Sequence, residues 1–172
     1  MTAISIYETK KRSFKLVDES EDIRIMKKGK VNEPFINGYN EGEYIFFAVR
    51  TRCLSIVMEI VFNGGNVNVN LEKSGITPLI AAVMNDDLDI VKFLIEKGAN
   101  IDAKTSLGYC VLFFAMCLPS IKIFRMLIEK GANVNSITNY GESLLTIIQK
   151  YHCFMKIIHI PRIELLVKNG AI

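Results

Sequence analysis

The chain has 172 residues, half of them hydrophobic and 23% charged, and its formal net charge at pH 7 is +3. This composition supports a buried core and argues against disorder, while the small net charge gives no strong field for nucleic acid or an anionic membrane. The longest apolar run, Cys110 to Leu118, is too short to cross a membrane, and the N-terminus lacks the apolar segment of a secretion signal.

Weak structural signals come first in the chain. Residues 1–16 are expected to form an extended arm. Asp18 to Glu21 then resembles a helix-capping box ahead of Ile23 to Lys28, and Gly29 to Asn32 resembles the ends of the units that follow. Residues 17–40 are therefore predicted to form a partial repeat that caps the domain.

The clearest helix signals lie in residues 71–103. Gly75 suits a tight turn that needs a positive φ, Thr77 is a good N-cap, and Pro78 stands where a helix start tolerates proline. One short helix is predicted to begin at Pro78. A second is predicted over Leu88–Lys97, because apolar residues recur there at helical spacing and a glycine follows.

The same order of signals recurs on both sides of this unit. Upstream, residues 41–70 contain a segment, 43–49, that aligns without a gap with residues 77–83. Downstream, residues 104–136 predict helices near Val111–Leu118 and Ser120–Lys130. Each segment thus repeats one pair of helices.

The last unit, residues 137–172, carries an insertion. Helices are predicted over Ser143–Tyr151 and Arg162–Asn169, and the stretch between them is six residues longer than in the preceding units. We expect His152–Pro161 to form an extended connection.

Three segments share one pattern at a fixed period. Glu96–Asp102 returns thirty-three residues later as Glu129–Asn135, and a weaker copy stands upstream at Phe62–Asn68. A period of this size indicates stacked helical units whose apolar faces are buried against their neighbours. The sequence therefore predicts an all-α solenoid of about four to five helix–turn–helix units, with degenerate N- and C-terminal caps.

Residues 18–172 resemble the ankyrin-repeat family, most closely through the motifs Gly75-x-Thr77-Pro78-Leu79-x-x-Ala82 and Ile90-Val91-x-x-Leu94-Ile95-x-x-Gly98-Ala99-x-Ile101-Asp102. The resemblance implies a non-enzymatic module that binds a protein partner through its concave face, formed by turn tips and first helices. The family usually has histidine after Thr-Pro-Leu, where it bridges neighbouring repeats. This chain has Phe46, Ile80, Phe113 and Thr146 there, so apolar packing must replace the polar bridges.

Residues able to support catalysis or metal binding are few. The two histidines, His152 and His159, lie in the insertion with Cys153, and we interpret them as loop residues rather than as a nucleophile–base pair. Asp86 and Asp87 fit a polar turn ahead of a helix better than a general acid and base. We therefore expect no enzyme activity, no cofactor and no metal.

Four cysteines lie in apolar segments without CxxC spacing: Cys53, Cys110, Cys117 and Cys153. This pattern predicts reduced and mostly buried thiols, because zinc and redox sites place cysteines at short regular spacings. We expect a cytoplasmic location, which is compatible with delivery into a host cell.

The family's mode of binding, carried onto this chain, implies nine partner-contacting residues: Tyr39, Lys73, Ile76, Lys104, Leu107, Tyr109, Asn139, Tyr140 and Tyr151. Aromatic and apolar side chains at turn tips could serve as binding anchors. The alternative is that some turn inward against the neighbouring unit. The pairs Phe46-Phe47 and Phe113-Phe114 could likewise form an aromatic stripe for a ligand, but core packing is the favoured interpretation.

The expected partner is a protein, and the chain is expected to act as a monomer. Several functions fit this expectation: a host-directed effector or viral host-range factor, or a small inhibitor of the immunity type. An enzyme with its site in the insertion and a self-assembling structural protein are the alternatives from other classes.

Overall fold

The computed structural model describes residues 41–71, 74–151 and 156–172. These residues form eight α-helices in four consecutive pairs: α3 (Glu41–Arg50) and α4 (Leu54–Phe62), α5 (Pro78–Met84) and α6 (Leu88–Glu96), α7 (Val111–Met116) and α8 (Lys122–Glu129), and α9 (Leu144–Tyr151) and α10 (Lys156–Lys168). No strand is assigned in this part of the chain, so the predicted all-α solenoid is confirmed. The predicted arm, 1–16, and the partial repeat, 17–40, lie outside the described residues.

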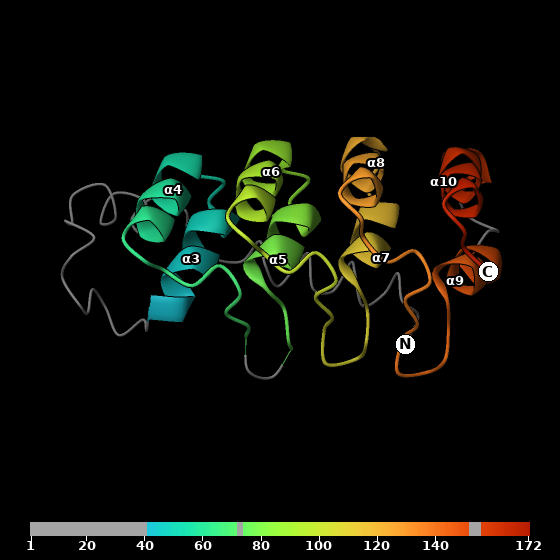
Figure 1. The fold of residues 1–172 in the computed structure, drawn as a ribbon, viewed down its shortest axis with the longest axis horizontal. Helices are drawn as coiled ribbons and strands as arrows, with labels where there is room; N and C mark the ends of the chain where they lie inside the picture. Colours follow the sequence, from blue (N-terminus) through green and yellow to red (C-terminus); the bar gives the residue numbers. More distant parts are fainter. Residues whose placement is uncertain (1–40, 72–73, 152–155) are drawn as a thin grey trace.

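The pairs stack side by side in two layers (Figure 1). The second helices α4, α6, α8 and α10 form one layer, the first helices α3, α5, α7 and α9 form the other, and the turns extend beyond the first helices (Figure 1). No described helix is long and apolar enough to cross a membrane.

In the unit formed by residues 71–103, both helices start at the predicted signals. The Thr77 hydroxyl oxygen accepts a hydrogen bond from the Ile80 N–H at 3.3 Å, and Pro78 is the first residue of α5. Asp87 caps α6 by accepting from the Ile90 N–H at 3.1 Å. Both caps satisfy N–H groups that have no partner inside the helix. The turn interpretation of Asp87 is thus confirmed.

The expected extended connection in the last unit is wrong for its described part. Residues 156–161 belong to α10, which contains Pro161 in its interior. Because proline has no N–H to donate within a helix, Pro161 was expected to mark the helix boundary. Instead, the six residues before Arg162 lengthen α10 at its N-terminal end. Residues 152–155 lie outside the described part of the chain.

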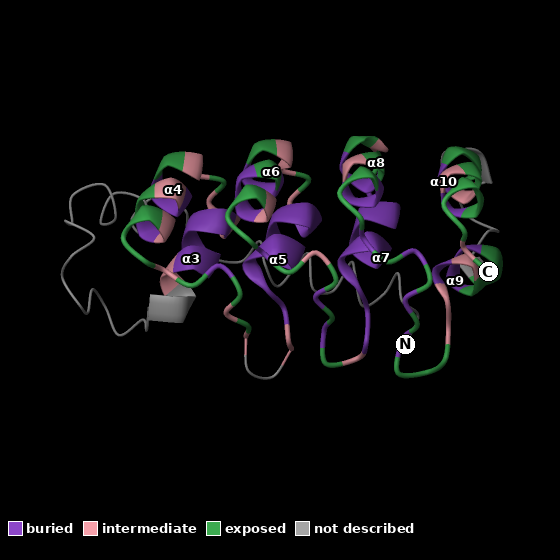
Figure 2. Cartoon of the chain, in the orientation of Figure 1, coloured by how far each residue is buried: buried purple, intermediate pink, exposed green. Residues whose placement is uncertain are grey.

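The core runs through the whole stack between the layers (Figure 2). Its members include Phe46, Phe113 and Phe114, each at most 5% exposed, while Phe47 is buried at 7% exposure but is not part of this cluster. Core packing is therefore confirmed for Phe46, Phe113 and Phe114. Phe46, Ile80 and Phe113 are buried where the family's histidine bridges would be, whereas Thr146 at the fourth such position is exposed.

A ladder of polar side chains joins successive units at the ends of the second helices. Asn68 donates from its amide to the Gly98 carbonyl at 3.0 Å and accepts from the Asn100 N–H at 2.7 Å. Asn135 repeats both bonds with Gly170 and Ile172, each at 2.9 Å. Between them, Asp102 accepts from the Asn133 N–H at 2.8 Å. An aspartate side chain has no N–H group, so Asp102 cannot donate the second bond, to the glycine carbonyl of the next unit.

The substitution Asp102→Asn is therefore expected to stabilise the protein by about 1 kcal/mol, because it supplies the second bond of the ladder. Urea unfolding would measure the change. The reverse substitution Asn135→Asp is the matched control and should destabilise by a similar amount. Equal stability of all three proteins would show that the ladder contributes nothing.

Candidate partner-binding surface

The turns are tied to each other along the stack. The Ser106 N–H donates to the Ser74 carbonyl at 2.9 Å, and the Asn139 N–H donates to the Leu107 carbonyl at 3.2 Å. Each described turn is also closed at its base by a backbone bridge, such as Lys104 with Cys110. The turn tips therefore form one connected row rather than independent loops.

Three of the nine predicted contact residues cannot be placed. Tyr39 and Lys73 lie outside the described residues. Tyr151 ends α9, but its side chain lies outside the described part of the structure. Their roles remain predictions.

Two predicted contact residues are buried, which corrects the expectation that they are exposed. Ile76 is 2% exposed and Tyr109 is 4% exposed. The Tyr109 ring stacks on Phe113 with centroids 4.5 Å apart. Tyr109 stands two residues before α7, and its ring folds back onto Phe113 of that helix. Neither side chain can touch a partner directly in this state.

Lys104 and Asn139 are exposed at the turns but also connect units. The Lys104 ammonium donates to the Ile137 carbonyl at 3.1 Å, and the Asn139 amide donates to the Ser106 carbonyl at 2.9 Å. Both bonds span neighbouring turns. These side chains therefore stabilise the row in addition to any contact with a partner.

The exposed apolar side chains of the row belong to the last turn. Tyr140 is 65% exposed and Ile137, outside the predicted nine, is 54% exposed, whereas Leu107 on the preceding turn is half-buried. Ile137 continues an alternation in which Ala132, Val134 and Ser136 are buried and the residues between them face solvent.

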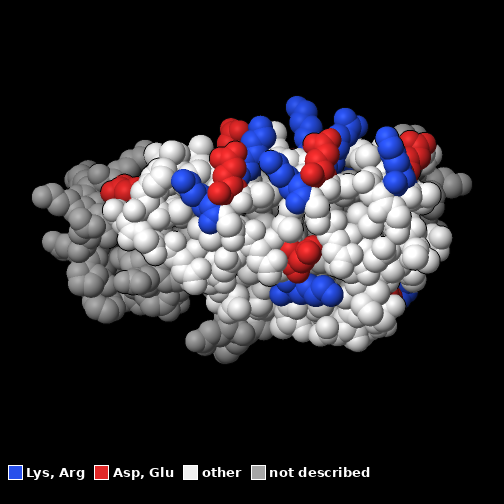
Figure 3. All heavy atoms as spheres, in the orientation of Figure 1, with Lys and Arg blue, Asp and Glu red and all other residues white. Residues whose placement is uncertain are grey.

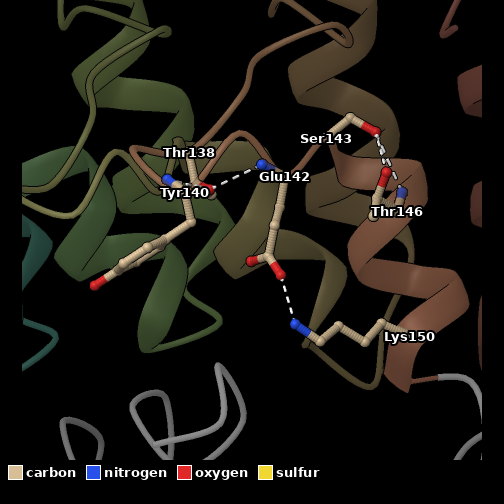
Figure 4. A network of polar contacts seen from close by, with 6 residues as sticks. All are labelled: Thr138, Tyr140, Glu142, Ser143, Thr146 and Lys150. Carbon is tan, nitrogen blue, oxygen red and sulfur yellow. Dashed lines mark hydrogen bonds and ion pairs between the residues drawn. The ribbon is translucent and has the colours of Figure 1, made fainter.

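A compact network holds the last turn in shape (Figure 4). The buried Thr138 hydroxyl oxygen accepts from the N–H groups of Tyr140 and Glu142 at 3.2 and 3.3 Å. Glu142 forms an ion pair with Lys150 of α9 at 2.7 Å. The Tyr140 ring points away from this network (Figure 4), so the turn presents the ring without using it as packing.

Most charged side chains in view lie over the second helices, while the side of the turns shows few (Figure 3). The first helices α5 and α7 contribute no exposed side chain at all. The accessible side chains of this side therefore come mainly from the turn tips.

No group of three or more metal-ligating side chains occurs among the described residues. The side chains of His152, Cys153 and His159 lie outside the described part, and an active site in the insertion stays an alternative. Cys53 and Cys110 are free thiols.

Burial raises the pKa of the Cys110 thiol above its ordinary value of 9.0, and hydrogen bonds from the Phe113 and Leu112 backbone only partly oppose this. Since the thiolate is the reactive form, alkylation of native protein should modify the partly exposed Cys53 well before Cys110. Peptide mapping by mass spectrometry would check the order. As the pH rises, the Cys110 thiol ionises earlier in the unfolded chain than in the folded protein. Its contribution to the free energy of unfolding is therefore present in full below about pH 9 and is lost at higher pH. Early modification of Cys110 would contradict its burial.

Comparison with known proteins agrees with this architecture. A family model described as ankyrin repeats (3 copies) matches residues 45–138, more than half of the chain. The B-cell lymphoma 3 protein homolog of Mus musculus is 32% identical over 80 residues, which are 46% of this chain and 18% of that protein.

Two further relatives match shorter segments. Alpha-latrocrustotoxin-Lt1a of Latrodectus tredecimguttatus is 41% identical over 61 residues, 35% of this chain and 4% of the toxin. The Arf-GAP with coiled-coil, ANK repeat and PH domain-containing protein 2 of Gallus gallus is 34% identical over 70 residues, 40% of this chain and 9% of that protein. The chain thus spans less than a fifth of each of these relatives. With its repeat motifs, stacked helix pairs and matching family model, the chain belongs to the ankyrin-repeat family.

Proposed function

We propose that this protein binds a protein partner through its row of turn tips, as a monomer and without catalysis. The main observation in favour of this proposal is that Ile137 and Tyr140, two large side chains on a hydrogen-bonded turn, are each more than half exposed. Ankyrin repeats generally mediate protein–protein interaction and the family is typically non-enzymatic. Lys104, Leu107 and Asn139 extend the same surface.

The chemistry of the last turn suits a protein surface. Tyrosine and isoleucine supply apolar contact area, and tyrosine adds a hydroxyl that can hydrogen-bond at the edge of an interface. Because the turn is already ordered by Thr138 and by the neighbouring turn, binding would cost little conformational entropy. Binding of this kind masks a partner's surface, which fits an inhibitor and a host-directed effector equally.

The free thiols of the described part favour a reducing compartment, and we include a cytoplasmic location in the proposal. A host-cell cytoplasm meets the same condition.

The test is an affinity capture from the source cells with the parent protein and with Ile137→Ala/Tyr140→Ala. We expect the double variant to lose the partner while its stability changes by no more than about 0.5 kcal/mol, since both side chains are exposed. Phe62→Ala is the matched control, because Phe62 is 64% exposed on the layer of second helices. Equal capture by all three proteins would disprove binding through the turn tips.

A further inference from the structure

The exposed hydrophobic side chains of the described residues are concentrated in the last unit. Six large hydrophobic side chains are more than half exposed, and five of them belong to residues 137–172: Ile137, Tyr140, Ile160, Val167 and Ile172. Ile137 and Tyr140 form part of the turn surface described above. Ile160 and Val167 lie instead on α10, in the layer of second helices (Figure 1), so the turn tips do not account for them.

Three apolar residues share one side of α10. Ile160, Ile163 and Val167 are spaced by three and four residues, so they follow each other along the helix over two turns, a length of about 10 Å. Ile160 is 51% exposed, Val167 is 57% exposed, and Ile163 between them is half-buried. These three residues are called the α10 stripe below.

The stripe lies on the side of α10 that faces along the stack. Ile163 stands seven residues before Gly170, and Phe124 stands seven residues before Gly131, the equivalent glycine after α8. Phe124 faces the second helix that follows it, because the guanidinium carbon of Arg162 in α10 is 6.0 Å from the centre of its ring. Ile163 and its neighbours in the stripe therefore point to where a further second helix would lie.

Helix packing buries the Ile163 position wherever a second helix follows. Val57, Val91 and Phe124 are all 0% exposed, and α4 packs against α6 as α6 packs against α8. At the position of Val167, the other units have residues that are half-buried or buried: Val61, Ile95 and Ile128. Among the described residues no helix follows α10, and the stripe is correspondingly more exposed than its equivalents.

The first helix of the last unit has lost the matching apolar side chains. Thr146 and Gln149 of α9 are exposed. Their equivalents in the three preceding units are apolar and at most 5% exposed: Phe46, Ile80 and Phe113, and Val49, Val83 and Met116. A complete further helix pair would therefore bury polar groups of α9, which is costly, whereas α10 keeps an apolar surface. This side of the last unit suits one helix and not a pair.

We propose that the α10 stripe docks one amphipathic α-helix of a partner protein. In the preceding units a second helix covers the equivalent stripe, so a docked helix continues the packing that already exists along the stack. The matching helix carries apolar residues three and four positions apart and polar residues elsewhere, because exposed charged residues of α10, Glu164 and Lys168, border the stripe.

The size of the stripe favours a partner helix over a second copy of the chain. Three side chains over two turns bury far less than the roughly 1,200 Å² of total surface that stable protein–protein interfaces bury. The stripe therefore gives a weak contact by itself. A partner held at Ile137 and Tyr140 would form this contact at a high effective concentration, since both surfaces belong to the last unit. That consequence rests on the proposed function, whereas docking of the helix does not.

The test uses a defined helix as the probe. A stapled peptide of about 15 residues, with leucines spaced by three and four residues and with alanine, glutamate and lysine elsewhere, is added to the full chain carrying labelled methyl groups. We expect the methyl signals of Ile163 and Val167 in NMR spectra to shift and saturate, with half-saturation on the order of 1 mM. A peptide of the same composition in scrambled order should produce no saturable shift.

Substitutions in the chain locate the site. Ile160→Ser/Val167→Ser should weaken peptide binding at least about tenfold, because two apolar contacts are lost. Both side chains are more than half exposed, so the fold should persist, and continued protection of Cys110 from alkylation checks this. Phe62→Ser is the matched control, because Phe62 is 64% exposed in the same layer but outside the stripe, and it should bind as the parent does.

The outcomes separate this site from the turn tips and from self-association. Ile137→Ala/Tyr140→Ala should bind the peptide as the parent does, so failure of the proposed function leaves this result unchanged. No saturation up to about 5 mM peptide, or equal shifts with the scrambled peptide, would overturn the proposal. Shifts of Ile163 and Val167 that grow with protein concentration in the absence of peptide would show that a second copy occupies the stripe, which would also overturn it.

Discussion

Replacement of Gly108 by alanine is expected to destabilise the protein by about 3 kcal/mol, because strained backbone and overlap with the next unit add together. Gly108 has a φ of +80°, which L-residues rarely adopt. A Cβ at this position would lie 2.5 Å from the backbone nitrogen of Asn139. That nitrogen belongs to the neighbouring turn and donates to the Leu107 carbonyl, so it cannot move without breaking the row.

The chain supplies a matched control for this effect. Gly141 occupies the equivalent position of the last turn with a φ of +74°, but a Cβ at this position would have no neighbouring atom within 4 Å. Gly141→Ala should therefore cost only the backbone term, about 1 kcal/mol. Urea unfolding of both variants gives the difference, which measures the close approach between turns. Similar losses would show that the approach costs nothing.

Replacement of Arg162 by alanine is expected to destabilise the last unit by about 3 kcal/mol, since buried charge-assisted hydrogen bonds are lost and a cavity is created. Arg162 is 1% exposed and donates to the carbonyls of Leu118 and Ser120 at 2.6 and 3.1 Å. Its guanidinium carbon lies 6.0 Å from the centre of the Phe124 ring. These contacts join α10 to the turn between α7 and α8.

Burial lowers the pKa of the Arg162 guanidinium, but an arginine stays charged at neutral pH. The cation is therefore held by carbonyl oxygens instead of water. Arg162→Lys should recover only part of the lost stability, because a compact ammonium does not reproduce the planar guanidinium, whose Nη2 donates to both carbonyls and which lies near the Phe124 ring.

Hydrogen exchange localises the effect of the arginine substitutions. In a stack, each unit contacts only its neighbours, so amides of α10 should lose protection while those of α6 keep it. Lys168→Ala, at an exposed position of α10, is the control and should change stability by no more than about 0.5 kcal/mol. Retained α10 protection in Arg162→Ala would contradict the role assigned to this arginine.

Much of the fold could be predicted because its signals are local. The period, the Thr77 cap, Pro78 and the glycines after the second helices each impose a backbone conformation on a few adjacent residues. The candidate site was less predictable. The exposure of a turn residue depends on which side chains lie beside it in the folded protein. Tyr140 is exposed, as expected, whereas Tyr109 is buried against Phe113.

The sequence by itself determined the repeat, the helix pairs and the family, because the hydrogen bonds and φ angles that define them form within one unit. Tertiary structure alone decided three other features. It buried Arg162 where the other units carry isoleucine, it continued α10 through Pro161, and it closed the sides of α5 and α7. Each of these depends on atoms supplied by a different part of the chain, and spacing along the sequence does not encode which atoms those are.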